Sequence, residues 1–171
     1  MGLLFAHAFL AISSIAVGLL AMRAGKFSSS HPRLGEIYHW LMLATCLSAL
    51  ALSYSRGRAT IFTYLTPPSY GFALVGYLMA KYRPANWLVW HIIGQTSSYL
   101  ALVTGVFFQL VPRIWRSDIM FLGFSLDFWI TLITPGFIGS FFIGDTLKKW
   151  SGVKAAKRRV QTFSELNSTG E

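Results

Sequence analysis

The sequence has little charge, and this shortage excludes most soluble folds. Only 12% of its 171 residues are Asp, Glu, Lys or Arg, whereas a typical soluble domain has about 25%. Hydrophobic residues make up 54%, and the mean hydropathy is +0.52. A disordered chain has the opposite composition, and an apolar fraction this high is typical of chains surrounded by lipid. We therefore expect an integral membrane protein.

Cysteine, acidic residues and the common catalytic motifs are also scarce. Cys46 is the one cysteine, so an intramolecular disulfide is excluded. The sequence contains no G-x-x-x-x-G-K-[ST], H-E-x-x-H, C-x-x-C or G-x-S-x-G motif. With 6 acidic residues in all, a two-carboxylate mechanism is difficult to place. Whether the protein is an enzyme stays open.

Five apolar stretches are long enough to cross a bilayer, which takes about 20 helical residues. They cover approximately residues 3–22, 36–55, 60–80, 87–111 and 119–144. The third contains Pro67 and Pro68, and we interpret it as a kinked helix, because neighbouring helices can satisfy the freed carbonyls. A re-entrant segment is the alternative. We predict an all-α bundle of five transmembrane helices that forms a single domain over residues 1–146.

The distribution of Lys and Arg predicts the orientation, since cytoplasmic loops carry the excess of these residues. One set of segments holds Arg23, Lys26, Arg33, Lys81, Arg83, Lys148, Lys149, Lys154, Lys157, Arg158 and Arg159. The other side holds only Arg56, Arg58, Arg113 and Arg116. Five crossings then place the N-terminus outside and the C-terminus in the cytoplasm.

The basic tail, residues 147–171, is expected to be disordered or to lie on the membrane surface, where anionic lipid attracts basic residues. The net charge of +9 comes from loops and this tail. It is therefore explained by membrane orientation, and we expect lipid rather than nucleic acid as the partner. A membrane complex or a homo-oligomer is a further expectation.

Polar residues inside the predicted spans are candidates for function, because they are costly there unless they are paired or hydrated. Gln95, Ser98 and Tyr99 lie in the polar run 95–99 of the fourth span. They predict either interhelical hydrogen bonds or a ligand pocket. His7 and Asp127 are expected near the outer ends of the first and fifth spans, at depths that allow a hydrogen bond, an ion pair or a proton-accessible pair.

His39 and His91 form the most specific pattern. Each is expected about one turn inside the cytoplasmic end of its helix, and the second and fourth spans run parallel. Histidines on facing helices are typical axial ligands of b-type haem iron. The alternative is an interfacial histidine that is hydrogen-bonded to lipid headgroups or to a neighbour. No metal site other than a haem iron is indicated.

The segment Gly25–Tyr38, G-K-F-S-S-S-H-P-R-L-G-E-I-Y, resembles a family of uncharacterised bacterial multi-pass membrane proteins. That family has an early His, a loop with H-R-x-x-G-x-x-Y and a later His followed by S-Y in a downstream span. The matching positions, within residues 3–110, are His7, His31, Arg33, Gly35, Tyr38, His91, Ser98 and Tyr99. The resemblance implies a multi-pass protein of the bacterial inner membrane, and no established activity.

Two departures from this pattern affect the histidines. Pro32 separates His31 from Arg33, and His39 has no counterpart in the family pattern. The resemblance therefore favours His31 with His91 over His39 with His91, with His31 in the loop before the second span.

Three functions remain open from the sequence. The first is an accessory or small-ligand-binding bundle whose polar groups hold helices together. The second is a membrane redox module that holds a b-type haem or a quinone through His91 with His39 or His31. The third is a small proton-coupled transporter that uses Asp127 and the polar fourth span.

Overall fold

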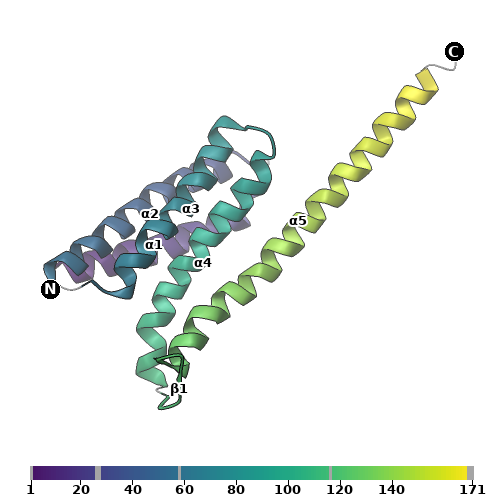
Figure 1. Ribbon diagram of the computed structural model, residues 1–171. Coiled ribbons are helices and arrows are strands. Elements are labelled where there is room, and N and C mark those ends of the chain that lie inside the picture. Colours follow the sequence, from purple (N-terminus) through teal and green to yellow (C-terminus); the bar gives the residue numbers. More distant parts are fainter. Residues whose placement is uncertain (1, 26–27, 58, 116, 169–171) are drawn as a thin grey trace. The chain divides into compact units, whose positions relative to one another are not determined.

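The protein is almost entirely helical. The computed structural model describes residues 2–25, 28–57, 59–115 and 117–168, with the side chains of all of these except Pro112, Phe142 and residues 149–168. Five helices follow one another along the chain (Figure 1): α1 (Gly2–Arg23), α2 (Ser30–Ser55), α3 (Ile61–Tyr82), α4 (Trp87–Ile114) and α5 (Leu126–Ser168). The strands β1 (Met120–Phe121) and β2 (Phe124–Ser125) pair antiparallel between α4 and α5.

The chain divides into two compact units. The first covers Met1–Gly139 and contains α1–α4, the β1–β2 hairpin and the beginning of α5. The second, Ser140–Glu171, continues α5 as far as Ser168. The predicted basic tail covers residues 147–171, and the structure does not describe the side chains of most of these residues. The expected disorder or membrane-surface binding of the tail therefore stays a prediction.

Helices α1–α4 form the core of the first unit. Each packs against the next along the chain, and α4 returns to contact α1 over a short stretch. Buried Met42, Cys46, Ala73 and Leu102 form the central cluster, from α2, α3 and α4. Ala11 and Ile15 of α1 pack against this cluster. The sequence therefore places one apolar layer in the middle of a four-helix arrangement.

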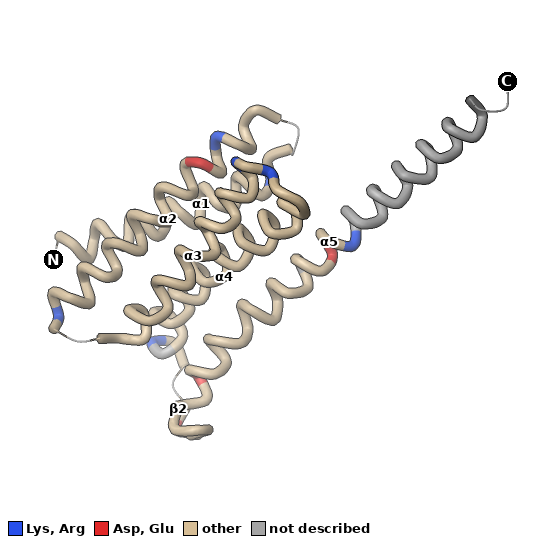
Figure 2. Tube along the Cα trace, turned by 45° about the horizontal axis from the view of Figure 1, so that its top comes forward, with Lys and Arg blue, Asp and Glu red and all other residues tan. Residues whose placement is uncertain are grey.

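Among the described helices, α1, α2 and the part of α5 from Leu126 to Lys148 are long and apolar enough to cross a membrane. Helices α3 and α4 are 22 and 28 residues long. They do not join that group, because their polar residues, including Thr63, Thr66 and the run 95–99, lower their mean hydropathy. Figure 2 shows that the Lys and Arg of α1–α4 lie at helix ends and in loops.

Helix α2 begins earlier than the sequence suggested. Its start at Ser30 places His31 in the first helical turn, whereas the sequence interpretation had His31 in a loop. Pro32 is compatible with this start because backbone N–H groups in the first turn lack intrahelical acceptors in any case. The histidine is thus held by helical backbone.

Helix α3 contains both Pro67 and Pro68 without a break. Its N-terminus is fixed by a capping box in which Thr60 and Thr63 satisfy each other's backbone N–H groups. The segment predicted as one helix over residues 60–80 is therefore one helix, from Ile61 to Tyr82.

The fifth helix begins later than predicted. Residues 120–125, assigned from their apolarity to the fifth span, form the β1–β2 hairpin instead. Leu122 and Gly123 have φ of 50° and 79°. Positive φ at both central positions is the geometry of a tight two-residue hairpin turn and is incompatible with a helix. Asp127 consequently lies in the first turn of α5, not two turns inside a span.

Candidate functional site

Two histidines from different helices meet at one end of the four-helix arrangement. The ring centres of His31, on α2, and His91, on α4, are 6.3 Å apart, and the ring planes are inclined at 80°. Both side chains are half-buried. The structure thus brings together the pair that the family resemblance favours.

The backbone of the other two helices orients these imidazoles. His31 Nδ1 lies 2.8 Å from the carbonyl oxygen of Ala21 on α1. His91 Nδ1 lies 2.8 Å from the carbonyl oxygen of Gly76 on α3. A carbonyl oxygen only accepts, so each Nδ1 carries the proton and donates it. Each Nε2 is then left with its lone pair, and the structure shows no hydrogen bond between either Nε2 and a described residue.

Helices α2 and α4 are aligned in parallel with a constant offset of 60 residues in their numbering. His31 meets His91, the Tyr38 hydroxyl lies 3.0 Å from Ser98 Oγ, and Met42 shares the core cluster with Leu102. Seven residues separate the first two layers, which corresponds to two turns or about 10.5 Å along the helix. The histidine pair therefore has a buried polar layer and an apolar layer beneath it.

Two glycines bring α3 close enough to α4 to hold His91. A Cβ atom on Gly94 would lie 2.7 Å from the backbone nitrogen of Gly76 and 2.7 Å from the carbonyl oxygen of Phe72. Gln95, the next residue on α4, donates from Nε2 to the carbonyl oxygen of Ala73 at 3.1 Å. The glycine contact, His91 and Gln95 together fasten α4 to α3. Gln95 thus has a structural partner.

A third glycine shapes the layer beneath the pair. A Cβ on Gly18 of α1 would lie 2.7 Å from Tyr99 Cδ2 and 2.9 Å from Tyr38 Cε2. Tyr38 is buried and Ser98 is fully buried. Ser98 also donates to the carbonyl oxygen of Gln95 at 2.9 Å. Ser98 and Tyr99 of α4, which the sequence singled out, therefore pack against α1 and α2.

His39 lies elsewhere, against α3. Its ring stacks on Tyr77 with centres 4.2 Å apart and planes inclined at 11°. Its Nε2 is 3.5 Å from the Tyr70 hydroxyl, and its Nδ1 is buried without a partner among the described residues. The structure shows no ring contact of His39 with His91 in the described part of the chain.

His7 and Asp127 have separate partners. His7 Nδ1 lies 2.8 Å from Ser48 Oγ, which links α1 to α2. Asp127 is buried, and its Oδ1 is 3.4 Å from the backbone nitrogen of Ser117. A carboxylate in the first turn of α5 is favoured by the unpaired N–H groups there. Both predicted residues thus fit roles in holding the fold together.

The rim of the histidine pair is aromatic and basic. Trp87, one turn before His91, has its ring centre 6.3 Å from that of His91. The Arg83 guanidinium carbon lies 5.3 Å from the centre of the Trp87 ring. Arg83 and Asn86 both have positive φ, 50° and 59°. The short loop between α3 and α4 therefore contains left-handed backbone conformations next to this site.

Sequence reasoning missed the groups that orient the histidines. The carbonyls of Ala21 and Gly76 have no sequence signature of their own. The signal that was available is the equal spacing of seven from His31 to Tyr38 and from His91 to Ser98, which places each pair on one helix face. No group of three or more His, Cys, Asp or Glu suited to a metal ion occurs among the described residues.

No protein-family model, curated protein or solved structure matches this chain.

Proposed function

We propose that the protein is a membrane redox module that binds one b-type haem with His31 and His91 as the axial ligands of its iron. The observation that carries this proposal is the neighbouring pair of imidazoles, each with Nδ1 hydrogen-bonded to a backbone carbonyl. Metal-ligating histidines almost always donate their second ring N–H to such a group, which fixes the tautomer and leaves the other nitrogen to bind metal.

The separation of the rings fits a shared iron. Two imidazoles that would approach one metal ion from opposite sides have ring centres roughly 6 Å apart, because each ligating nitrogen lies about 2 Å from the metal and about 1 Å from its own ring centre. The observed distance is 6.3 Å. Each ring could rotate about its bond to a metal, so an inclination of 80° between the rings would still allow both Nε2 atoms to reach one iron. Two ligands on different helices are also the usual way in which helical bundles hold haem.

The tautomers favour haem over a quinone. A quinone carbonyl needs a hydrogen-bond donor, but both Nδ1–H groups already donate to protein carbonyls. What the pair offers is two Nε2 lone pairs, which suit a metal ion. Bound haem would supply one-electron transfer, while the chain would orient the ligands and exclude water from the buried layer of Tyr38 and Ser98.

The proposed setting is the cell membrane of a bacterium, with α1–α4 and the apolar part of α5 all crossing it. Helices α3 and α4 are long enough to cross, and their polar groups are largely satisfied inside the bundle, as lipid requires. The excess of Lys and Arg then places the N-terminus outside and the C-terminus in the cytoplasm. The histidine pair lies near the cytoplasmic face in this topology.

The remaining polar contacts support an accessory role as the second candidate. Ser14 bonds to Thr45 at 3.0 Å, and the contacts of His7, Gln95 and Ser98 also join helices. These bonds account for polar residues in spans without any ligand. They do not account for two oriented imidazoles with free Nε2 atoms. Transport through Asp127 gains no support from its position in a helix's first turn.

The test is the visible absorption spectrum of full-length protein expressed with ample haem and purified in detergent. We expect a Soret band, with α and β bands that sharpen on reduction with dithionite. His31→Ala and His91→Ala should each remove most of the bound haem. His91→Gly with added imidazole should restore the spectrum, because free imidazole can replace the missing ligand.

His7→Gln is the matched control, since it changes a histidine in a helix contact far from the pair. It should keep the haem content of the unchanged protein. A spectrum without a Soret band would refute the proposal and favour the accessory role. Equal haem content in all variants would show that the iron is bound by other residues.

A further inference from the structure

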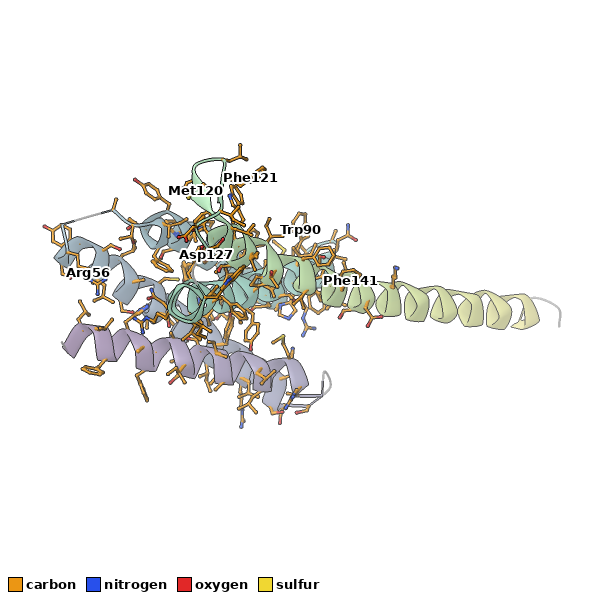
Figure 3. All side chains as sticks on the ribbon, turned by 90° about the horizontal axis from the view of Figure 1, so that it is seen from below. Arg56, Trp90, Met120, Phe121, Asp127 and Phe141 are labelled. Atoms are coloured by element: carbon orange, nitrogen blue, oxygen red, sulfur yellow. The ribbon has the colours of Figure 1, made fainter. Side chains whose placement is uncertain are left out.

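The β1–β2 hairpin exposes an apolar tip for which the fold provides no cover. Five large apolar side chains in and beside it are exposed: Ile119, Met120, Phe121, Leu122 and Phe124. Figure 3 shows Met120 and Phe121 on this hairpin, which stands clear of α1–α3. No charged residue interrupts the sequence from Ile119 to Leu126. We infer that this tip inserts into the lipid headgroup region of the membrane that α5 crosses.

Leu122, at the turn, indicates that an apolar side chain is favoured at the tip. Leu122 and Gly123 occupy the two central positions of the turn, both with positive φ. Asn or Asp followed by Gly is preferred in such a turn, because leucine tolerates positive φ poorly. Leu122 is nevertheless 73% exposed. A leucine that is this exposed adds little packing inside the protein, and contact with surrounding lipid would account for its place at a positive-φ position.

The hairpin is built to enter a less polar medium. Leu126 N–H donates to the carbonyl oxygen of Ile119 at 2.9 Å, and Trp129 Nε1–H donates to the carbonyl oxygen of Phe121 at 2.8 Å. The strands pair Met120 with Ser125 and Phe121 with Phe124. Satisfied backbone groups lower the cost of leaving water, which is the main obstacle to placing non-helical backbone near lipid.

The position of the hairpin in the chain indicates that lipid surrounds its tip. Leu126, which follows the hairpin directly, begins a helix that is long and apolar enough to cross a membrane. Trp115 and Trp129 flank the hairpin in the sequence, and tryptophan is enriched at the membrane–water interface. Apolar segments of this kind enter the boundary of headgroups and acyl chains by about 5–10 Å. Insertion of the tip rests on the proposed crossing of the membrane by α5 and is independent of haem binding.

The test places a nitroxide label on single cysteines in full-length protein that carries Cys46→Ala. The protein is reconstituted into vesicles of phosphatidylcholine and phosphatidylglycerol. Labels at Met120→Cys and Leu122→Cys should collide more often with oxygen, which concentrates in lipid, than with a water-soluble nickel chelate. A label at the exposed control position Asp118→Cys should show the opposite preference.

Leu122→Asn separates turn formation from insertion, because asparagine suits the turn and not lipid. In this variant the label at Met120→Cys should shift toward the nickel chelate, whereas Leu122→Met should leave it unchanged. Greater nickel than oxygen access at Met120→Cys and Leu122→Cys would overturn the inference. Low access to both reagents would also overturn it, since the tip would then be covered by protein, such as a second copy of this chain.

Discussion

At the residue scale, hydrogen bonds set the chemistry of each imidazole. The partner of Nδ1 fixes where the proton of an imidazole lies. It therefore decides whether Nε2 donates a hydrogen bond, accepts one or binds a metal. In His31 and His91 that partner is a backbone carbonyl, so Nε2 is available as a ligand. In His39 the ring stacks on Tyr77 and is 3% exposed. Equal depth in the membrane, which the sequence suggested for His39 and His91, does not decide which rings face each other.

The bond between Tyr38 and Ser98 yields a prediction about stability. Tyr38→Phe removes one interhelical hydrogen bond and should cost about 0.6 kcal/mol of unfolding free energy, the average in membrane helices. Ser98→Ala leaves the Tyr38 hydroxyl buried without that partner and should cost about 1–3 kcal/mol. Denaturation in mixed micelles measures both.

The double variant Tyr38→Phe with Ser98→Ala provides the control for this prediction. It should be less destabilised than the sum of the two single variants, because neither partner is then left unsatisfied. Strict additivity of the two effects would contradict the direct bond.

At the element scale, the sequence predicted the existence of the helices better than their ends. Apolar length identified α1, α3 and α4 within a few residues. The start of α2 was missed because the second span was bounded by its apolar stretch, residues 36–55, whereas the helix also includes the more polar residues before it. The hairpin was missed because apolarity alone cannot distinguish a helix from a short strand pair. Gly123, in the dipeptide Leu122-Gly123, was a weak local signal for the turn of this hairpin.

The pairing of histidines could be predicted only in part. The family resemblance pointed to His31. The equal spacing of seven residues from His31 to Tyr38 and from His91 to Ser98 was an available signal that the sequence interpretation did not use. The carbonyls that orient the rings depend on how closely the helices approach, which the sequence does not record. Gly76 and Gly94 determine that approach between α3 and α4.

Substitution of Gly94 tests this contact. Gly94→Ala puts a methyl group against backbone atoms of Gly76 and Phe72, which cannot move aside as a side chain can. The helices must separate, and we expect a loss of roughly 1–3 kcal/mol in unfolding free energy, together with weaker haem retention through His91.

Gly105→Ala is the matched control on the same helix, since a Cβ there meets nothing within 4 Å. It should be neutral or stabilising by about 0.5–1 kcal/mol, as expected for alanine in a helix. Equal destabilisation by the two substitutions would contradict a specific role for the Gly76–Gly94 contact.

At the scale of the whole molecule, one arrangement joins the polar residues around the histidine pair. Helices α1 and α3 supply carbonyls, and helices α2 and α4 supply the imidazoles that these carbonyls orient. The buried layer of Tyr38 and Ser98 and the apolar cluster around Met42 lie beneath the pair. All four helices thus converge on a single site near one end, as expected for a bundle that holds a cofactor.

The most direct measurement is the electron paramagnetic resonance spectrum of the oxidised, purified full-length protein at low temperature. Two imidazole ligands on one haem predict a low-spin ferric signal, and His31→Ala or His91→Ala should remove it. A high-spin ferric signal, or no haem signal at all, would contradict ligation by this pair.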